Sequence, residues 1–108
     1  MTLRTTLAAA CAWALLWLGA GALAAQPLTH TVVIEGLKFV PAAIMVKRGD
    51  TVVWVNKDPY PHTATAKGVF DSGSIAEGGS WKYTARRAGE HSYLCTFHPN
   101  MKAVLRVE

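Results

Sequence analysis

The most informative segment of the chain is Cys95-Thr96-Phe97-His98-Pro99-Asn100-Met101. Three side chains that bind metals, a thiol, an imidazole and a thioether, stand within these seven residues. The segment follows one strand-like run that ends at Cys95 and precedes another at residues 103–107. Turns within the segment would bring Cys95, His98 and Met101 toward one point between the two strands.

The chain after the first 24 residues shows the same pattern of short strands throughout. Runs rich in Val, Ile, Thr and aromatic residues are broken by turn residues at intervals of about 8 to 12, which is typical of a β-sandwich or barrel. No stretch has a sustained helical period. The expected strands are Thr29–Glu35, Lys38–Val40, Ile44–Lys47, Thr51–Asn56, Thr63–Ala66, Ser80–Thr84, His91–Cys95 and Ala103–Val107. The sequence therefore predicts an all-β, Greek-key β-sandwich or barrel of about seven to eight strands. The expected core residues are Met45, Trp54, Trp81, Phe39, Phe70 and Tyr93.

The first residues have the composition of a secretory signal. Arg4 provides a positive start, Leu7–Leu18 an apolar run, and Ala22-Leu23-Ala24 a small-residue cleavage site. The predicted organisation is a signal peptide over residues 1–24 and one domain over residues 25–108, exported to the periplasm. The apolar stretch is nearly long enough for a membrane span, so an uncleaved anchor is the alternative.

Removal of the leader leaves ten Lys and Arg against seven Asp and Glu, a net charge of +3. This mild excess argues against a nucleic-acid-binding protein. The mature chain keeps a single cysteine, Cys95, and so forms no intrachain disulfide. A lone thiol in an oxidising compartment is open to oxidation unless it is buried or bound to a ligand. We therefore expect Cys95 to be protected.

A fourth ligand has to come from elsewhere in the chain. His62 follows the Pro-rich loop at residues 58–61, which a sandwich places at the end where loops cluster. A solvated loop histidine is the alternative interpretation of His62. His30 lies among alternating Thr and Val and is expected at the surface. His91 lies on the same strand face as Cys95 and is expected to be a half-buried packing residue.

The types of ligand select the metal. A thiolate, a thioether and two imidazoles suit copper in both oxidation states, whereas zinc sites rarely include Met. A trigonal His, His, Cys set with a weak axial Met is the arrangement of an electron-transfer copper site. The predicted ligands of one copper ion are His62, Cys95, His98 and Met101. The alternatives are Cys95 as a small buried residue or a nucleophile, and Met101 as a core residue that fills a gap.

The mature chain resembles the cupredoxins, small blue copper proteins that include plastocyanin, amicyanin and pseudoazurin. The matching segments are Trp54–Asp58 leading into Pro61-His62-Thr63, Phe70–Gly73, Gly78–Trp81, and the Cys95 loop running into Met101–Val104. The two-residue gap between His98 and Met101 is similar to that of amicyanin. The resemblance implies one type 1 copper, bound through both imidazole Nδ1 atoms, in an electron carrier that is not an enzyme.

Three positions depart from the family pattern. Many members have Asn after the first ligand histidine, and its side chain ties the two ligand loops together. Thr63 stands there in this chain, so that hydrogen bond is expected to be shorter or absent. His91 and Ala103 replace an aromatic residue and a glycine. Such changes around the ligands tune the reduction potential.

The function implied is a soluble, monomeric periplasmic carrier that moves one electron between redox partners as its copper cycles between Cu(I) and Cu(II). We expect the edge of His98 to reach the surface between Phe97, Pro99 and the Tyr60-Pro61 loop. The lysines expected around it are Lys57, Lys67 and Lys102. They indicate an acidic partner such as a cytochrome or a dehydrogenase. The alternative function is copper delivery or storage with the same ligands.

Overall fold

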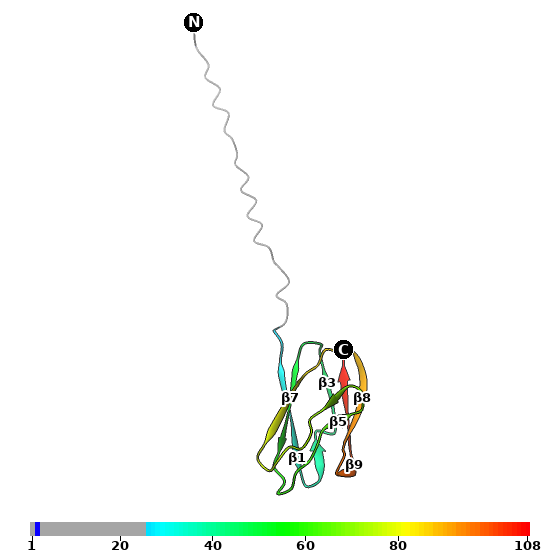
Figure 1. Cartoon of the computed structure of the whole chain (residues 1–108). Coiled ribbons are helices and arrows are strands. Elements are labelled where there is room, and N and C mark those ends of the chain that lie inside the picture. Colours follow the sequence, from blue (N-terminus) through cyan, green and yellow to red (C-terminus); the bar gives the residue numbers. More distant parts are fainter. Residues whose placement is uncertain (1, 3–25) are drawn as a thin grey trace.

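The computed structural model of the protein describes residues 26–108, together with residue 2. Apart from residue 2, the predicted signal peptide lies outside the described residues. The described chain forms nine strands in two sheets that lie face to face (Figure 1). None of the described residues belongs to a helix long and apolar enough to cross a membrane. The predicted all-β sandwich is confirmed.

The first sheet has the strand order β2-β1-β4-β7. Its strands are β1 (Thr29–Glu35), β2 (Lys38–Val40), β4 (Thr51–Asn56) and β7 (Ser80–Thr84). The second sheet has the order β3-β9-β8-β5-β6. Its strands are β3 (Ala43–Val46), β5 (Thr65–Ala66), β6 (Phe70–Asp71), β8 (Gly89–Cys95) and β9 (His98–Val107). The parallel pairs β1–β4 and β3–β9 arise because the chain crosses between the sheets at β3.

Strands β1, β2, β4 and β7 have the predicted bounds. The predictions for the second sheet were less accurate. Strand β6 was not predicted, and β5 begins at Thr65 rather than Thr63. Strand β9 begins at His98 rather than Ala103, because a tight turn pairs Cys95 with His98. The ligand segment is therefore largely part of the strand pairing and forms only a short loop.

The core lies between the sheets and is built on alternating positions of β4, β8 and β9. Trp54 is completely buried, with its ring centroid 5.3 Å from that of Phe70 and 5.5 Å from that of Tyr93. Burial raises the pKa of Tyr93 to about 12. The core prediction is wrong for Met45, which is 56% exposed. Met45 lies opposite Arg106 on the outer face of the sheet, where the strand alternation points it to solvent.

His30 was predicted to lie at the surface, but it is half-buried and lies against a carboxylate. Its Nε2 lies 2.9 Å from Oδ2 of Asp50, a buried residue at the β3–β4 turn. The Asp50 carboxylate also accepts hydrogen bonds from the amides of Leu28 and Lys47, both at 3.0 Å. The Leu28 amide, His30 and the Lys47 amide together lower the pKa of Asp50 to about 2. Asp50 thus joins the start of β1 to the β3–β4 turn.

Candidate metal centre

Two loops at one end of the sandwich carry the site. Cys95 ends β8 and His98 begins β9. The turn between them places the two residues directly opposite each other in the strand pairing. His62 comes from the loop between β4 and β5. It is fixed by an isolated bridge to Ile75, in which its amide donates to the Ile75 carbonyl at 3.1 Å and its carbonyl accepts from the Ile75 amide at 2.7 Å.

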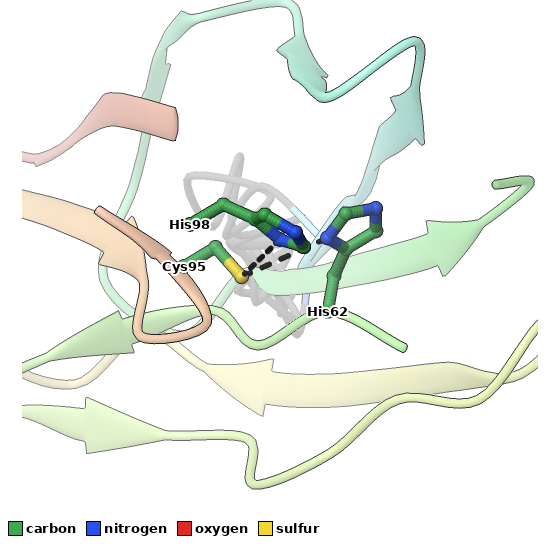
Figure 2. A group of neighbouring side chains, drawn as sticks. All are labelled: His62, Cys95 and His98. Carbon is green, nitrogen blue, oxygen red and sulfur yellow. Dashed lines mark hydrogen bonds between the residues drawn. The ribbon is translucent and has the colours of Figure 1, made fainter. Parts of the chain in front are cut away.

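The structure brings three of the predicted ligands together (Figure 2). The Cys95 Sγ lies 3.7 Å from His62 Nδ1 and 3.8 Å from His98 Nδ1. The ligand atoms of all three residues lie within 4.8 Å of one another. His62 and Cys95 are completely buried, and His98 is half-buried. Within residues 26–108, no other three His, Cys, Asp or Glu residues come close enough to hold a metal.

These distances fit a metal at the centre of the group. A metal bonded at about 2.3 Å to sulfur and about 2.1 Å to nitrogen, the lengths that Zn²⁺ shows in proteins, separates the two donor atoms by about 3.8 Å at about 120° and about 3.6 Å at about 109°. The two distances in this protein fall within that range. A set of one sulfur and two nitrogens around the metal is typical of electron-transfer copper sites.

Met101 lies in β9, three residues after His98, and is only 4% exposed. The strand alternation places it on the inner face together with Ala103 and Leu105. This position is on the core side of the sheet, next to the turn that carries His98. Its role as the fourth ligand stays a prediction.

Asp58 contacts His62, and the sequence analysis did not predict this supporting role. Its Oδ2 lies 2.8 Å from His62 Nε2. The same carboxylate accepts hydrogen bonds from the amides of Gly36 at 2.7 Å and Leu37 at 2.9 Å, both in the β1–β2 turn. The available signal was an acidic residue four positions before the histidine in a loop that contains Pro59 and Pro61.

The charge of Asp58 determines which ring nitrogen of His62 carries the proton. Burial acts to raise the pKa of Asp58, but hydrogen bonds from the Leu37 and Gly36 amides and from His62 outweigh it, so the pKa lies below its usual range. An ionised carboxylate at Nε2 favours the tautomer with its proton there. The lone pair of Nδ1 is then left on the side that faces Cys95.

Asn56 holds the His62 loop from the inside and is completely buried. Its Nδ2 donates to the carbonyls of Tyr60 at 2.8 Å and Ile75 at 2.9 Å. Its Oδ1 accepts from the Asp58 amide at 3.0 Å. All hydrogen-bonding atoms of the Asn56 amide group are thus used to fix the loop.

Thr63 ties the two ligand loops together, so the hydrogen bond that was expected to be shorter or absent is present. The Thr96 amide donates to Thr63 Oγ1 at 2.8 Å, and the Thr63 amide donates to Cys95 Sγ at 3.3 Å. The short side chain is sufficient because the loops approach closely at this point.

The other histidines lie away from the site. His91 is half-buried as predicted, and its Nε2 lies 2.8 Å from the Arg87 carbonyl oxygen. Beside the ligands, Tyr60 and Phe97 are 48% and 52% exposed. The Tyr60 ring centroid lies 6.4 Å from that of His98. An apolar rim, formed by Tyr60 and Phe97, therefore borders the half-buried imidazole.

Comparison with known proteins agrees with this geometry. The family model of a cupredoxin-like domain matches residues 7–107. The chain belongs to the cupredoxin-like family. The amicyanin-alpha of Methylorubrum extorquens is 32% identical to this cupredoxin over 101 residues, which cover 84% of this chain and 85% of that protein. The amicyanin of Paracoccus versutus is 33% identical over 81 residues, 69% of this chain. This cupredoxin spans only 61% of that relative's length.

Solved structures show the same likeness. A Cu(I) form of an amicyanin variant has a TM-score of 0.69 and 29% identity, covering 74% of this chain and 82% of that one. A copper-containing nitrite reductase from Thermus scotoductus has a TM-score of 0.71 and 31% identity, covering 82% of this chain but 24% of that one. The fold of this cupredoxin therefore also occurs within a much longer enzyme.

Proposed function

We propose that this cupredoxin is a periplasmic one-electron carrier that binds one type 1 copper ion through His62, Cys95, His98 and Met101. The observation that carries the proposal is the spacing of 3.7 and 3.8 Å between the Cys95 sulfur and the two imidazole nitrogens. When bound there, copper supplies a centre that gains and loses one electron between Cu(II) and Cu(I).

The residues of the chain keep the ligands in place during that cycle. Asp58 and Asn56 hold the His62 loop, and Thr63 joins it to the turn after Cys95. Ligands that are held by packing and hydrogen bonds stay in position when the charge changes. Small movement of the ligands is what a fast electron carrier requires.

The half-buried edge of His98 is the proposed point of electron exchange. The apolar rim of Tyr60 and Phe97 loses water readily when a partner docks, and a small interface allows a brief encounter. The proposed partners are redox proteins with acidic surfaces, of the cytochrome or dehydrogenase type. The protein is proposed to meet them as a monomer.

Two other functions fit the site less well. A thiol nucleophile has to meet its substrate, whereas Cys95 is completely buried. Copper delivery or storage uses the same ligands but requires easy release. The hydrogen bonds around His62 favour retention of the metal instead. A reversible Cu(II)/Cu(I) couple supports the carrier, and rapid loss of copper to an acceptor protein would support delivery.

The direct test is to add Cu(II) to the metal-free protein. An intense blue colour is expected from thiolate-to-copper charge transfer. Cys95→Ser and His62→Gln are expected to lose it while keeping the fold, as followed by circular dichroism. The matched control His91→Gln changes a histidine outside the site and is expected to stay blue. A colourless copper complex of the unchanged protein would contradict the proposal.

Export is tested separately, by sequencing the N-terminus of the protein recovered from the periplasm. The proposed cleavage after Ala24 predicts a mature chain that begins at Ala25. A full-length chain that stays with the membrane would show that the leader is kept as an anchor.

A further inference from the structure

Strands β5 and β6 form a short two-stranded arm that continues from the His62 loop. Thr65 lies opposite Asp71 in this arm and also pairs with β8 (Figure 1). The bridge between His62 and Ile75 closes the arm at its other end. Thr65 therefore stands at the junction between the arm that carries one proposed ligand and the strand that ends at another, Cys95.

Three threonine hydroxyls connect this arm to the turn after Cys95. The Thr65 hydroxyl donates to Thr63 Oγ1 at 3.0 Å. Thr63 Oγ1 also accepts a hydrogen bond from the Thr96 amide at 2.8 Å and lies 3.1 Å from Thr96 Oγ1. A hydroxyl group has one proton and two lone pairs. Because both lone pairs of the Thr63 oxygen face donors, its own proton is left for the Thr96 hydroxyl.

The proton of Thr65 has a second acceptor, the carboxylate of Asp71. Asp71 Oδ1 lies 3.1 Å from Thr65 Oγ1 and also accepts the Gly73 amide at 2.9 Å. Since the hydroxyl has only one proton, Thr63 and Asp71 compete for it. Hydrogen bonds to an ionised carboxylate are stronger than those to a neutral oxygen. Asp71 is exposed, so water weakens its hold and the proton is shared between the two acceptors.

We propose that Thr65 is a positioning residue for the copper ligands and that Asp71 sets how strongly it acts. This inference rests on the proposed copper site. Thr63 and Thr96 each directly follow a proposed ligand, so the distance between them fixes how closely the two ligand loops approach. Donation from Thr65 polarises the Thr63 hydroxyl, which strengthens its hydrogen bond to Thr96. Thr65 therefore holds the two loops together from a position outside the ligand set.

The same link reaches the sulfur of the site. The Thr63 amide donates to Cys95 Sγ at 3.3 Å. Hydrogen bonding around the cysteine sulfur tunes the reduction potential of an electron-transfer copper site. Because the amide and the hydroxyl belong to one residue, a change at Thr65 moves the amide relative to the sulfur. A longer hydrogen bond leaves more negative charge on the sulfur, which favours Cu(II) and lowers the potential.

The first test uses nuclear magnetic resonance on the ¹⁵N-labelled, metal-free protein. The amide proton shifts of Thr63 and Thr96 report the lengths of their hydrogen bonds to Cys95 Sγ and Thr63 Oγ1. Thr65→Val removes the hydroxyl but keeps the branched shape, and both signals are expected to move upfield. Thr65→Ser keeps a hydroxyl and is expected to leave both signals near their original positions. Thr31→Val makes the same change at an exposed position of β1 and is expected to move neither signal.

Asp71→Asn distinguishes this role from ordinary packing. Its amide oxygen still accepts the Gly73 amide but competes less for the Thr65 proton than a carboxylate does. The same two amide signals are thus expected to move downfield, opposite to their change in Thr65→Val. In the double variant Thr65→Val, Asp71→Asn, the second substitution is expected to add nothing, because the shared proton is gone. Glu77→Gln removes an exposed acidic side chain elsewhere and controls for the change in charge.

The second test is voltammetry of the copper-loaded protein. Thr65→Val is expected to lower the reduction potential, whereas Thr65→Ser and Thr31→Val are expected to keep it. A loss of stability alone leaves the potential unchanged, so an unchanged potential in Thr65→Val would overturn the proposal.

The metal-free protein gives two more results that would overturn it. One is an Asp71→Asn shift that persists in the double variant, because the effect would then bypass the Thr65 proton. The other is an unchanged or upfield shift in Asp71→Asn alone, which tests the proposal even if Thr65→Val does not fold. Because these shifts are measured without metal, failure of the hydroxyl link is distinguishable from failure to form a blue copper site.

Discussion

The clearest prediction from the structure concerns Asn56, the buried amide that fixes the His62 loop. Asn56→Ala removes the two donors to the Tyr60 and Ile75 carbonyls and the acceptor for the Asp58 amide. All three partners are backbone groups, but the Ile75 carbonyl keeps the hydrogen bond from the His62 amide, so only the Asp58 amide and the Tyr60 carbonyl lose their partner. The contacts to Ile75 and Asp58 are fully buried, whereas the one to Tyr60 is partly buried.

The magnitude follows from these contacts. A buried polar group left without a partner, here the Asp58 amide, costs about 1–2 kcal/mol. The partly buried Tyr60 carbonyl and the loss of one of the two hydrogen bonds to the Ile75 carbonyl each cost about 0.5–1 kcal/mol. The free energy of unfolding should fall by about 2–4 kcal/mol in total. At about 0.05–0.15 kcal/mol per residue, a domain of this length has only about 4–12 kcal/mol of stability. The substitution therefore removes a large share of it.

The assay is urea unfolding of the metal-free protein, followed by fluorescence of the buried Trp54. With a urea dependence of about 1–1.5 kcal/mol per molar, the midpoint should drop by about 1–4 M. Asn100→Ala, at an exposed position, is the control and should change the free energy of unfolding by less than about 0.5 kcal/mol. Asn56→Asp keeps the shape but sets an oxygen against two carbonyls, so it should be at least as destabilising as Asn56→Ala.

A loss of less than about 1 kcal/mol in Asn56→Ala would refute this reasoning, because it would mean that the loop keeps its shape without the amide. A lower free energy of unfolding in Asn56→Ala but not in Asn56→Asp would also refute the reasoning. It would show that Asn56 stabilises the loop by filling space rather than by hydrogen bonding.

Three more predictions concern the residues around the site and the opposite end of the fold. Asp50 has a folded-state pKa of about 2 against an ordinary value of 3.8, so its contribution to stability is present above about pH 4 and is lost as the pH falls through about 2. In urea unfolding, Asp50→Asn should thus have a lower free energy of unfolding than the unchanged protein at neutral pH, and this difference should shrink toward about pH 2. A difference that stays constant with pH would contradict the lowered pKa of Asp50. Met101→Gln should lower the reduction potential measured by voltammetry, because an oxygen donor favours Cu(II); an unchanged potential would remove Met101 from the ligands. Thr63→Val leaves the Thr96 amide without its acceptor and should cost about 1–2 kcal/mol in urea unfolding of the metal-free protein, with exposed Thr29→Val as the control. An equal effect of the two valine substitutions would exclude the hydrogen bond as the cause.

The sequence predicted the regular part of the fold because alternation is strict there. Strand β4 alternates between buried and half-buried positions along its whole length, and its bounds were predicted correctly. Strand β6, with two residues, is too short for any period to show. Met45 was misplaced because an apolar residue on the outer face has the same composition signal as one on the inner face. Only the pairing with β9 shows which face it occupies.

The site was predictable where its residues are close in sequence. The spacing of Cys95 and His98 indicated a shared turn, and the structure places both nitrogens and the sulfur within one group. The supporting contacts were not predictable, because they join segments far apart in the chain. Asp58 meets Gly36 across 22 positions, and Thr63 meets Thr96 across 33. No local sequence pattern indicates which turn packs against which loop.

The unequal burial of the ligands has a consequence for how the metal arrives and leaves. His62 and Cys95 have no contact with solvent, so a metal ion would enter past the half-buried edge of His98. Rotation of this one imidazole would then control both the uptake of copper and its removal by thiol or cyanide chelators. A docked protein that covered Tyr60 and Phe97 would block this route. Bound copper would then be retained, and free ions would not exchange with it, until the two proteins separate.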